Sequence, residues 1–148
     1  MIEYTVKVDT NGTRCWYLNG NLHREDGPAI EYANGSRLWY LNGKRHREDG
    51  PAIERADGTR RWYLNGKPHR EDGPAVEYPD GGSRFWYLNG KPHREDGPAF
   101  EYADGDRYWY LNGEEYTKKE FNKKTAKAKE LTVAEIEALL GYQIKVVK

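Results

Sequence analysis

Residues 50–73 read Gly-Pro-Ala-Ile-Glu-Arg-Ala-Asp-Gly-Thr-Arg-Arg-Trp-Tyr-Leu-Asn-Gly-Lys-Pro-His-Arg-Glu-Asp-Gly, and this stretch is one copy of a repeated unit. The signature Trp-Tyr-Leu-Asn-Gly, then His-Arg-Glu-Asp-Gly-Pro-Ala, recurs along the chain. Its tryptophans are 23, 23, 24 and 23 residues apart, at Trp16, Trp39, Trp62, Trp86 and Trp109. A fixed period of this size indicates one supersecondary unit stacked on copies of itself.

Each unit is predicted to form a β-hairpin, because two short β-prone runs flank a pair of turn residues. In the stretch above this pair is Asp57-Gly58, which supplies the positive φ angles that tight hairpin turns favour. Asn65-Gly66 then marks the exit from the second strand. Pro74 stands at the start of the next strand, where a missing N–H costs least. We expect Lys-x-His-Arg-Glu-Asp to be a connector between hairpins.

Repetition of this hairpin predicts a mainly β fold, an elongated single-layer antiparallel meander of roughly ten strands and on the order of 45 Å in length. A thin sheet fits a hydrophobic content of 36% and a mean hydropathy of -1.07. The 12 Tyr, 5 Trp and 3 Phe supply large rings that cover much area per residue. The one extra residue, within 79–82, is expected to lengthen a turn or form a bulge and leave the ladder intact.

The two faces of the predicted sheet differ in how much the copies vary. Period-two alternation places Trp39 and Leu41 on one face, and Leu38 and Tyr40 on the other. Trp and Leu never change, so their face is predicted to be the packed one. The position before each Trp varies and is predicted to be more exposed; it is occupied by Cys15, Leu38, Arg61, Phe85 and Tyr108. A ladder of Glu and Arg across the hairpin is expected under one turn register, which the sequence leaves open.

The chain divides into residues 1–113, which hold the repeats, and 114–148, a C-terminal cap. Residues 2–8 are predicted to form a terminal capping strand. Thr117 to Glu120 and Thr132 to Glu135 match capping boxes. They predict helices at about 118–128 and 133–140, followed by a short strand in which Tyr142, Ile144 and Val146 alternate. If the caps cover the sheet edges only in part, we expect a homodimer through an edge.

Charge and cysteine content narrow the function classes. The 24 basic and 24 acidic side chains cancel, so no overall field attracts nucleic acid or anionic lipid, and neither is an expected partner. Cys15 is the single cysteine; it fits a reducing compartment and is expected to be inert. The first eight residues lack the apolar run of a signal peptide, and no stretch is long enough to span a bilayer. We therefore predict a cytoplasmic protein.

The repeated His-Arg-Glu-Asp quartet is the boldest candidate site, because imidazole beside carboxylates can act as a general base or bind metal. An enzyme needs one preorganised constellation, however, whereas these copies lie about 10 Å apart, too far to share a zinc ion. We favour a structural role, in which Asp satisfies turn amides while His and Arg bridge neighbouring units, and expect no catalytic residue, cofactor or metal. The residues concerned are His23, His46, His69 and His93, with Asp26, Asp49, Asp72 and Asp96.

The pattern Asn-Gly-Lys-x-His, then Gly, then Glu-Tyr-Ala-Asp-Gly-Ser, then Trp resembles the MORN repeat, whose period is also 23 residues and whose unit is a β-hairpin. The resemblance covers about residues 3–113. Here Arg-Glu-Asp-Gly-Pro-Ala replaces the usual His-Gly-x-Gly, which is similar to variant repeats of bacterial and tailed-phage proteins, some of them labelled antitoxin-like. The resemblance implies a protein-binding module.

Our leading hypothesis is a non-enzymatic module for protein–protein interaction, with a host protein as partner if the chain is phage-encoded, such as a defence protein that it inhibits or modulates. Alternatives are a protein that sequesters a nucleotide or signalling ligand with its Arg and aromatic columns, a scaffold or antitoxin-like component, and an enzyme that uses the quartet. The candidate interaction surface comprises Leu38, Arg61, Phe85, Tyr108, Tyr40, Tyr63, Tyr87, Tyr110, Lys118, Lys119, Phe121 and Lys123.

Overall fold

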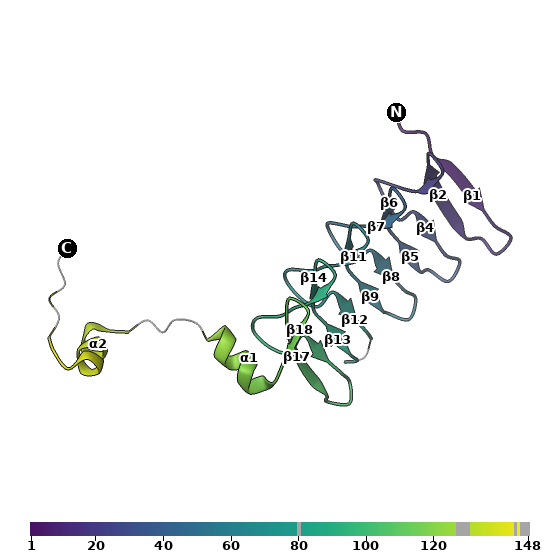
Figure 1. The fold of residues 1–148 in the computed structure, drawn as a ribbon. Coiled ribbons are helices and arrows are strands. Elements are labelled where there is room, and N and C mark those ends of the chain that lie inside the picture. The colour runs from purple at the N-terminus through teal and green to yellow at the C-terminus, as the bar shows by residue number, and fades with distance from the viewer. Residues whose placement is uncertain (80, 127–130, 144, 146–148) are drawn as a thin grey trace.

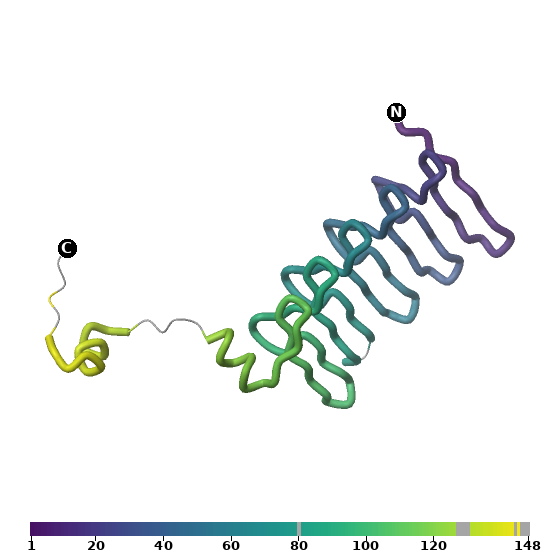
Figure 2. The backbone as a smooth tube through the Cα atoms, in the orientation of Figure 1, coloured from purple at the N-terminus to yellow at the C-terminus, as the bar shows by residue number. Residues whose placement is uncertain are grey.

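The computed structural model describes residues 1–79, 81–126, 131–143 and 145. In these residues the fold is mainly β, with 18 strands and two C-terminal helices, and the predicted antiparallel meander is confirmed (Figure 1). The smooth trace repeats the same double loop along one axis (Figure 2). The 12 strands of the main sheet are β1 (Thr5–Val8), β2 (Arg14–Leu18), β3 (Asn21–Leu22), β4 (Ile30–Glu31), β5 (Arg37–Leu38), β8 (Ile53–Glu54), β9 (Arg60–Arg61), β12 (Val76–Glu77), β13 (Arg84–Phe85), β16 (Phe100–Glu101), β17 (Arg107–Leu111) and β18 (Glu114–Tyr116).

Each internal unit contains a second, smaller hairpin, which the sequence interpretation missed. Asn65 and Gly66 have φ angles of 50° and 80°, both positive as in a type I′ turn, and they join two paired strands. We had expected this pair only to end the second strand of the unit, and the residues after it to form a connector. In the longer turn of the main sheet, by contrast, Gly58 adopts a positive φ of 92° and Asp57 does not. The small hairpins form a row along one side of the sheet (Figure 1); their strands are β6 (Tyr40–Leu41), β7 (Lys44–Arg45), β10 (Tyr63–Leu64), β11 (Lys67–Pro68), β14 (Tyr87–Leu88) and β15 (Lys91–Pro92).

Backbone hydrogen bonds join each unit to the next at the tryptophan. The Trp62 N–H donates to the carbonyl of Ala75 at 2.8 Å, and the Trp62 carbonyl accepts from the N–H of His69 at 3.1 Å. The N–H of Arg70 donates to the Tyr87 carbonyl at 3.1 Å. The tryptophan therefore separates the strand in the main sheet from the strand in the small hairpin, and its polar backbone groups are satisfied on both sides.

The strand register assigns the faces of the main sheet. Ile53 lies opposite both Leu38 and Arg61, and residues opposite each other in an antiparallel sheet share a face. The variable column therefore lies beside the buried aliphatic column. Its members are half-buried except for Tyr108, which is 39% exposed, and the tryptophans are half-buried as well, so burial does not separate the two columns. The buried aliphatic residues Ile30, Ile53 and Val76 lie on the face of the variable column, so the prediction that the Trp and Leu face is the packed one is wrong. We call the face of the variable column the aromatic face; its members in the main sheet are Cys15, Ile30, Leu38, Ile53, Arg61, Val76, Phe85, Phe100 and Tyr108.

The extra residue changes a turn and not the ladder, as predicted. Val76 still pairs with Phe85 and Glu77 with Arg84, as in the shorter units. The Gly82 N–H closes the longer turn by donating to the Pro79 carbonyl at 3.0 Å. The insertion is thus accommodated in the turn that joins β12 and β13, and the pairing of these two strands is unchanged.

A strand caps the N-terminal end of the sheet, and a helix packs against its C-terminal end. The capping strand predicted over 2–8 forms as β1, which is shorter and pairs with β2 over Thr5–Val8. At the other end, α1 (Lys118–Thr125) begins at the predicted capping box of Thr117 and packs against β17 and β18, where Phe121 is only 3% exposed. Helix α1 ends sooner than the predicted 118–128, whose last two residues lie outside the described part.

Helix α2 (Val133–Leu140) matches its predicted bounds. Thr132 forms the predicted capping box, and Gly141 ends the helix at a φ of 73°. The helix buries none of its residues and lies beyond α1, apart from the sheet (Figure 1). Of the predicted final strand, Tyr142 is not in a strand, while Ile144 and Val146 lie outside the described residues. Neither described helix combines the length and apolar character that a membrane crossing would require.

Candidate interaction face

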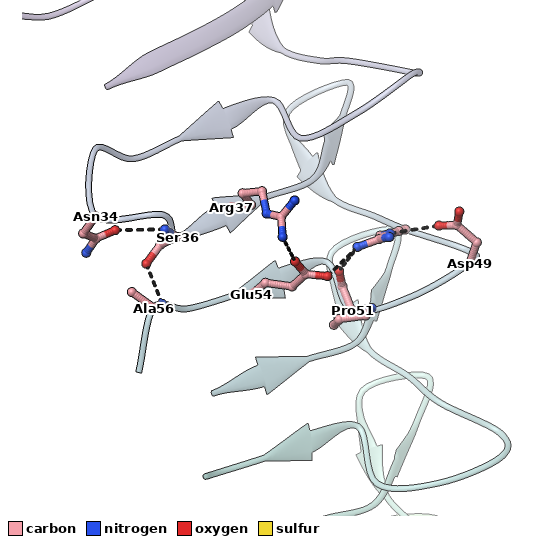
Figure 3. A network of polar contacts seen from close by, with 8 residues as sticks. Asn34, Ser36, Arg37, Asp49, Pro51, Glu54 and Ala56 are labelled. Atoms are coloured by element: carbon pink, nitrogen blue, oxygen red, sulfur yellow. Dashed lines mark hydrogen bonds and ion pairs between the residues drawn. The ribbon is translucent and has the colours of Figure 1, made fainter. Parts of the chain in front are cut away.

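The arginine of each quartet lies on the face opposite the aromatic face, where it contacts a tryptophan ring, two carboxylates and a backbone carbonyl. The Arg47 guanidinium lies 3.9 Å from the ring centre of Trp39, a cation–π contact. It donates to Asp49 Oδ1 and to Glu54 Oε1, both at 2.9 Å, and to the carbonyl of Pro51 at 3.2 Å (Figure 3). The same arrangement recurs around Arg24, Arg70 and Arg94.

The Glu and Arg ladder that the sequence left open forms on this same face. Glu54 lies opposite Arg37 on one side and Arg60 on the other. The Arg37 guanidinium approaches Glu54 Oε2 at 3.1 Å, so Glu54 pairs with both Arg37 and Arg47 (Figure 3). We call this the quartet face. It consists of this ladder, the tryptophans and the His-Arg-Glu-Asp quartets.

Each histidine of the quartets lies between two units. His46 Nδ1 accepts a hydrogen bond from the N–H of Asn65 in the next unit at 3.1 Å, and the other three copies make the equivalent bond. Because Nδ1 is the acceptor, this network assigns the ring hydrogen to Nε2 in His46, His69 and His93. His23 Nδ1 lies 3.0 Å from the Asn42 nitrogen and 3.1 Å from Asn42 Oδ1. In all four copies Nε2 lies 3.5–3.7 Å from a carboxylate oxygen of the quartet's own Glu, which is beyond a good hydrogen bond.

The quartet aspartates differ from the expectation that they accept from turn amides. Asp49 and Asp72 accept instead from Arg47 and Arg70, and this hydrogen bond with its positive charge lowers the pKa of both carboxyl groups. The amides of the long turns are satisfied by other side chains, as where Asp57 Oδ1 accepts from the N–H of Thr59 at 2.8 Å. The quartet is thus a closed charge cluster rather than a turn cap.

Three open hollows lie between successive quartets. The first has a volume of about 950 Å³, with the quartets at 23–26 and 46–49 as walls and Trp39 and Leu41 in its lining. The second, of about 720 Å³, is the same hollow one unit further, around Trp62. The third, of about 970 Å³, adds residues of α1 to its lining, namely Phe121, Asn122 and Thr125. A similar cavity is therefore built three times, one unit apart.

Each hollow carries a negative rim. Two arginines and four carboxylates line it, and the arginine side chains are only 21–23% exposed because they are bound to Trp, Asp and Glu. The Glu and Asp side chains of the quartets are 60–85% exposed. A ligand in a hollow would therefore meet carboxylates before it met a guanidinium. Among the described residues, no group of three or more His, Cys, Asp or Glu side chains is arranged to hold a metal ion.

The residues that we had predicted as an interaction surface fall in two places. The aromatic face holds eight of them; Tyr87 and Tyr110 contact Phe100, Tyr63 packs with Ile53, and Arg45 donates to the Tyr40 hydroxyl. These eight are Leu38, Arg61, Phe85, Tyr108, Tyr40, Tyr63, Tyr87 and Tyr110. Lys118, Lys119 and Lys123 are exposed on α1, whereas Phe121 is 3% exposed, packs against the sheet and lines the third hollow.

Sequence reasoning missed the hollows themselves. Their lining includes Leu41, Leu64 and Leu88, which we had expected to be packed, and the glutamates of the quartets. The charge of the quartets could have indicated this acidic surface. Every quartet carries two carboxylates and one arginine, so its four copies form an acidic strip on a chain with no net charge.

Replacement of His46 by alanine is expected to lower the free energy of unfolding by about 1 kcal/mol, because the Asn65 N–H loses its acceptor. The same change at His69 should have the same effect. Urea denaturation followed by tryptophan fluorescence measures both, with exposed Lys44→Ala as the control. One histidine with a far larger effect than the other would contradict an equal structural role.

No protein-family model matches this chain, and a search of curated proteins finds no relative. The similarity to the MORN repeat therefore stays a resemblance in period, punctuation and hairpin unit.

Proposed function

We propose that this chain is a non-enzymatic repeat module that binds a protein partner along the quartet face. The observation that carries the proposal is the threefold repetition of one hollow, with the same side chains, at intervals of one unit. A partner that enters several hollows gains from linked contacts, each weak by itself, because the later contacts form within the same complex.

The contacts within the quartets favour binding over catalysis. Each histidine uses Nδ1 to hold the next unit, so this nitrogen cannot serve as a general base, and each arginine is bound to two carboxylates. The same pairing disfavours the nucleotide alternative, since a phosphate would have to displace carboxylates from Arg47 or its equivalents. A cytoplasmic location, and a host defence protein as partner if the chain is phage-encoded, are finer parts of this proposal.

Capture of the partner from a lysate tests the proposal with three forms of the immobilised chain. The wild type and Glu114→Lys/Glu115→Lys, a charge reversal outside the hollows, should both retain a saturable partner. Glu48→Lys/Glu71→Lys makes the same change in charge within the hollows and should lose it. Circular dichroism is the control that all three forms are folded. Equal retention by both variants, or no saturable partner for the wild type, would refute binding through the quartet face.

A further inference from the structure

We propose that the quartet face binds an extended peptide segment in the polyproline II conformation that carries Lys or Arg at every third residue, with one basic side chain in each hollow. This inference rests on the proposed function and names the chemistry of the partner. Four properties of the hollows support it: their charge, their lining, their spacing and one hydrogen-bond donor.

The charge of the hollows selects a basic side chain. Glu48 lines the first and second hollows and Glu71 the second and third, and both side chains are 85% exposed. The nearby guanidinium of Arg47 is already bound to Asp49 and Glu54. An incoming ammonium or guanidinium group can therefore pair with the exposed glutamates without displacing an existing ion pair. An acidic segment would meet four carboxylates in each hollow.

The lining of the hollows suits the long stem of Lys or Arg. Trp39 and Leu41 supply apolar surface in the first hollow, and Trp62 and Leu64 supply it in the second. Lysine and arginine commonly bury their methylene groups on such surface while their charged ends stay in water. Here the charged end would reach the glutamates and aspartates at the rim.

The spacing of the hollows selects the conformation of the peptide. Equivalent points on successive hairpins are about 9.6 Å apart, twice the spacing between strands. A polyproline II helix repeats every three residues and rises about 9.3 Å in that interval, so every third side chain points the same way. In a β-strand every third side chain points to the opposite face. An α-helix advances about 5.4 Å per turn, so its turns do not match the hollows one to one.

His23 adds a hydrogen-bond donor to the first hollow. Its side chain is 7% exposed and lines that hollow, and Nε2, which carries the ring hydrogen when Nδ1 accepts from the Asn42 N–H, is buried without a hydrogen-bond partner. The nearest carboxylate oxygen, on Glu25, lies 3.6 Å away. A buried donor without an acceptor is unfavourable. A polyproline II segment has no internal hydrogen bonds, so its carbonyl groups are available to accept from this donor after a small movement of the walls.

Two peptides of identical composition test the inference on the full chain. One repeats Lys-Pro-Pro four times, and the other repeats Lys-Lys-Pro-Pro-Pro-Pro twice, which breaks the three-residue register. We expect the regular peptide to bind roughly five-fold more tightly by calorimetry, since misplaced lysines lose exposed ion pairs. Binding should weaken as salt is added. Equal affinity of the two peptides would overturn the assigned register and conformation.

Matched variants locate the site. Glu48→Gln/Glu71→Gln removes two carboxylates from the hollows and should weaken binding of the regular peptide roughly five-fold. Glu114→Gln/Glu115→Gln makes the same change in charge on β18 and should leave the affinity unchanged. No binding of the regular peptide, or equal weakening by both pairs, would overturn this inference. If Glu48→Lys/Glu71→Lys still abolished capture of a cellular partner in that case, the proposed function would stand and its partner would have other chemistry.

Discussion

The change Ile53→Ala is expected to lower the free energy of unfolding by about 3 kcal/mol. Ile53 is 3% exposed and packs with Ala52, Tyr63 and Leu38 in the middle of the sheet. Removal of its three outer carbon atoms leaves a cavity, and a sheet of one layer has no second layer that could move in to fill it. Lost packing in a central unit also weakens the interfaces with both neighbouring units. A repeat protein needs these interfaces for cooperative folding.

Denaturation in guanidinium chloride, followed by circular dichroism and tryptophan fluorescence, measures this loss. The matched control is Ile2→Ala, because Ile2 is 43% exposed and its truncation should change the free energy of unfolding by less than about 0.5 kcal/mol. Similar losses at Ile53 and Ile2 would show that the aromatic face is not the main source of stability.

The change Arg70→Lys is expected to lower the free energy of unfolding by about 2 kcal/mol, although it preserves the charge. The Arg70 guanidinium lies 3.9 Å from the ring centre of Trp62 and donates to Asp72 and Glu77 at 2.9 and 3.0 Å. It also donates to the carbonyl of Pro74 at 3.2 Å. Lysine has a single, compact donor group and cannot bind both carboxylates and the carbonyl while it stacks on the ring. Charge-assisted hydrogen bonds of this kind contribute about 1.5–3 kcal/mol.

Arg55→Lys provides the control, since Arg55 is an exposed residue of a hairpin turn. Its effect on the free energy of unfolding should stay within about 0.5 kcal/mol. If Arg70→Lys proved equally harmless, a single positive charge would be enough at this position. The closed cluster of Arg, Trp, Asp and Glu would then not be what stabilises the quartet face.

Features of this fold that depend on a few neighbouring residues were predictable from the sequence, whereas features that depend on contacts between units were not. The hairpin repeat, the tolerance of one extra residue in 79–82 and the capping boxes of both helices were predictable. They follow from period, turn residues and helix caps, which act over a few residues. The second hairpin, at Asn65-Gly66, also depends on local turn residues. We missed it because we interpreted this pair only as the end of a strand. Two consecutive residues with positive φ are typical of a type I′ turn.

The candidate site was less accessible to sequence reasoning. Alternation correctly separated Leu38 from Trp39, but which face is more buried depends on neighbours from other units. Invariance of Trp suggested a packed ring. In the structure the half-buried Trp39 does pack against the cluster of Ala52, Ile53 and Tyr63, and Arg47 of the following loop also covers its ring, a contact that no local rule predicts. The hollows form only when two successive quartets lie side by side, so no single copy of the unit contains one.

The sequence by itself determined that this protein is an antiparallel stack of hairpins with helices at its C-terminus, because turn and cap residues fix the backbone locally. Only the tertiary structure decided the register of the Glu and Arg ladder, the burial of the variable column and the charge that the quartet face presents. Each of these depends on hydrogen bonds and ion pairs between units, such as those of Glu54 with Arg37 and Arg47. On the quartet face the quartet arginines are only 21–23% exposed while the quartet carboxylates are 60–85% exposed, which gives a chain without net charge an acidic rim around each hollow.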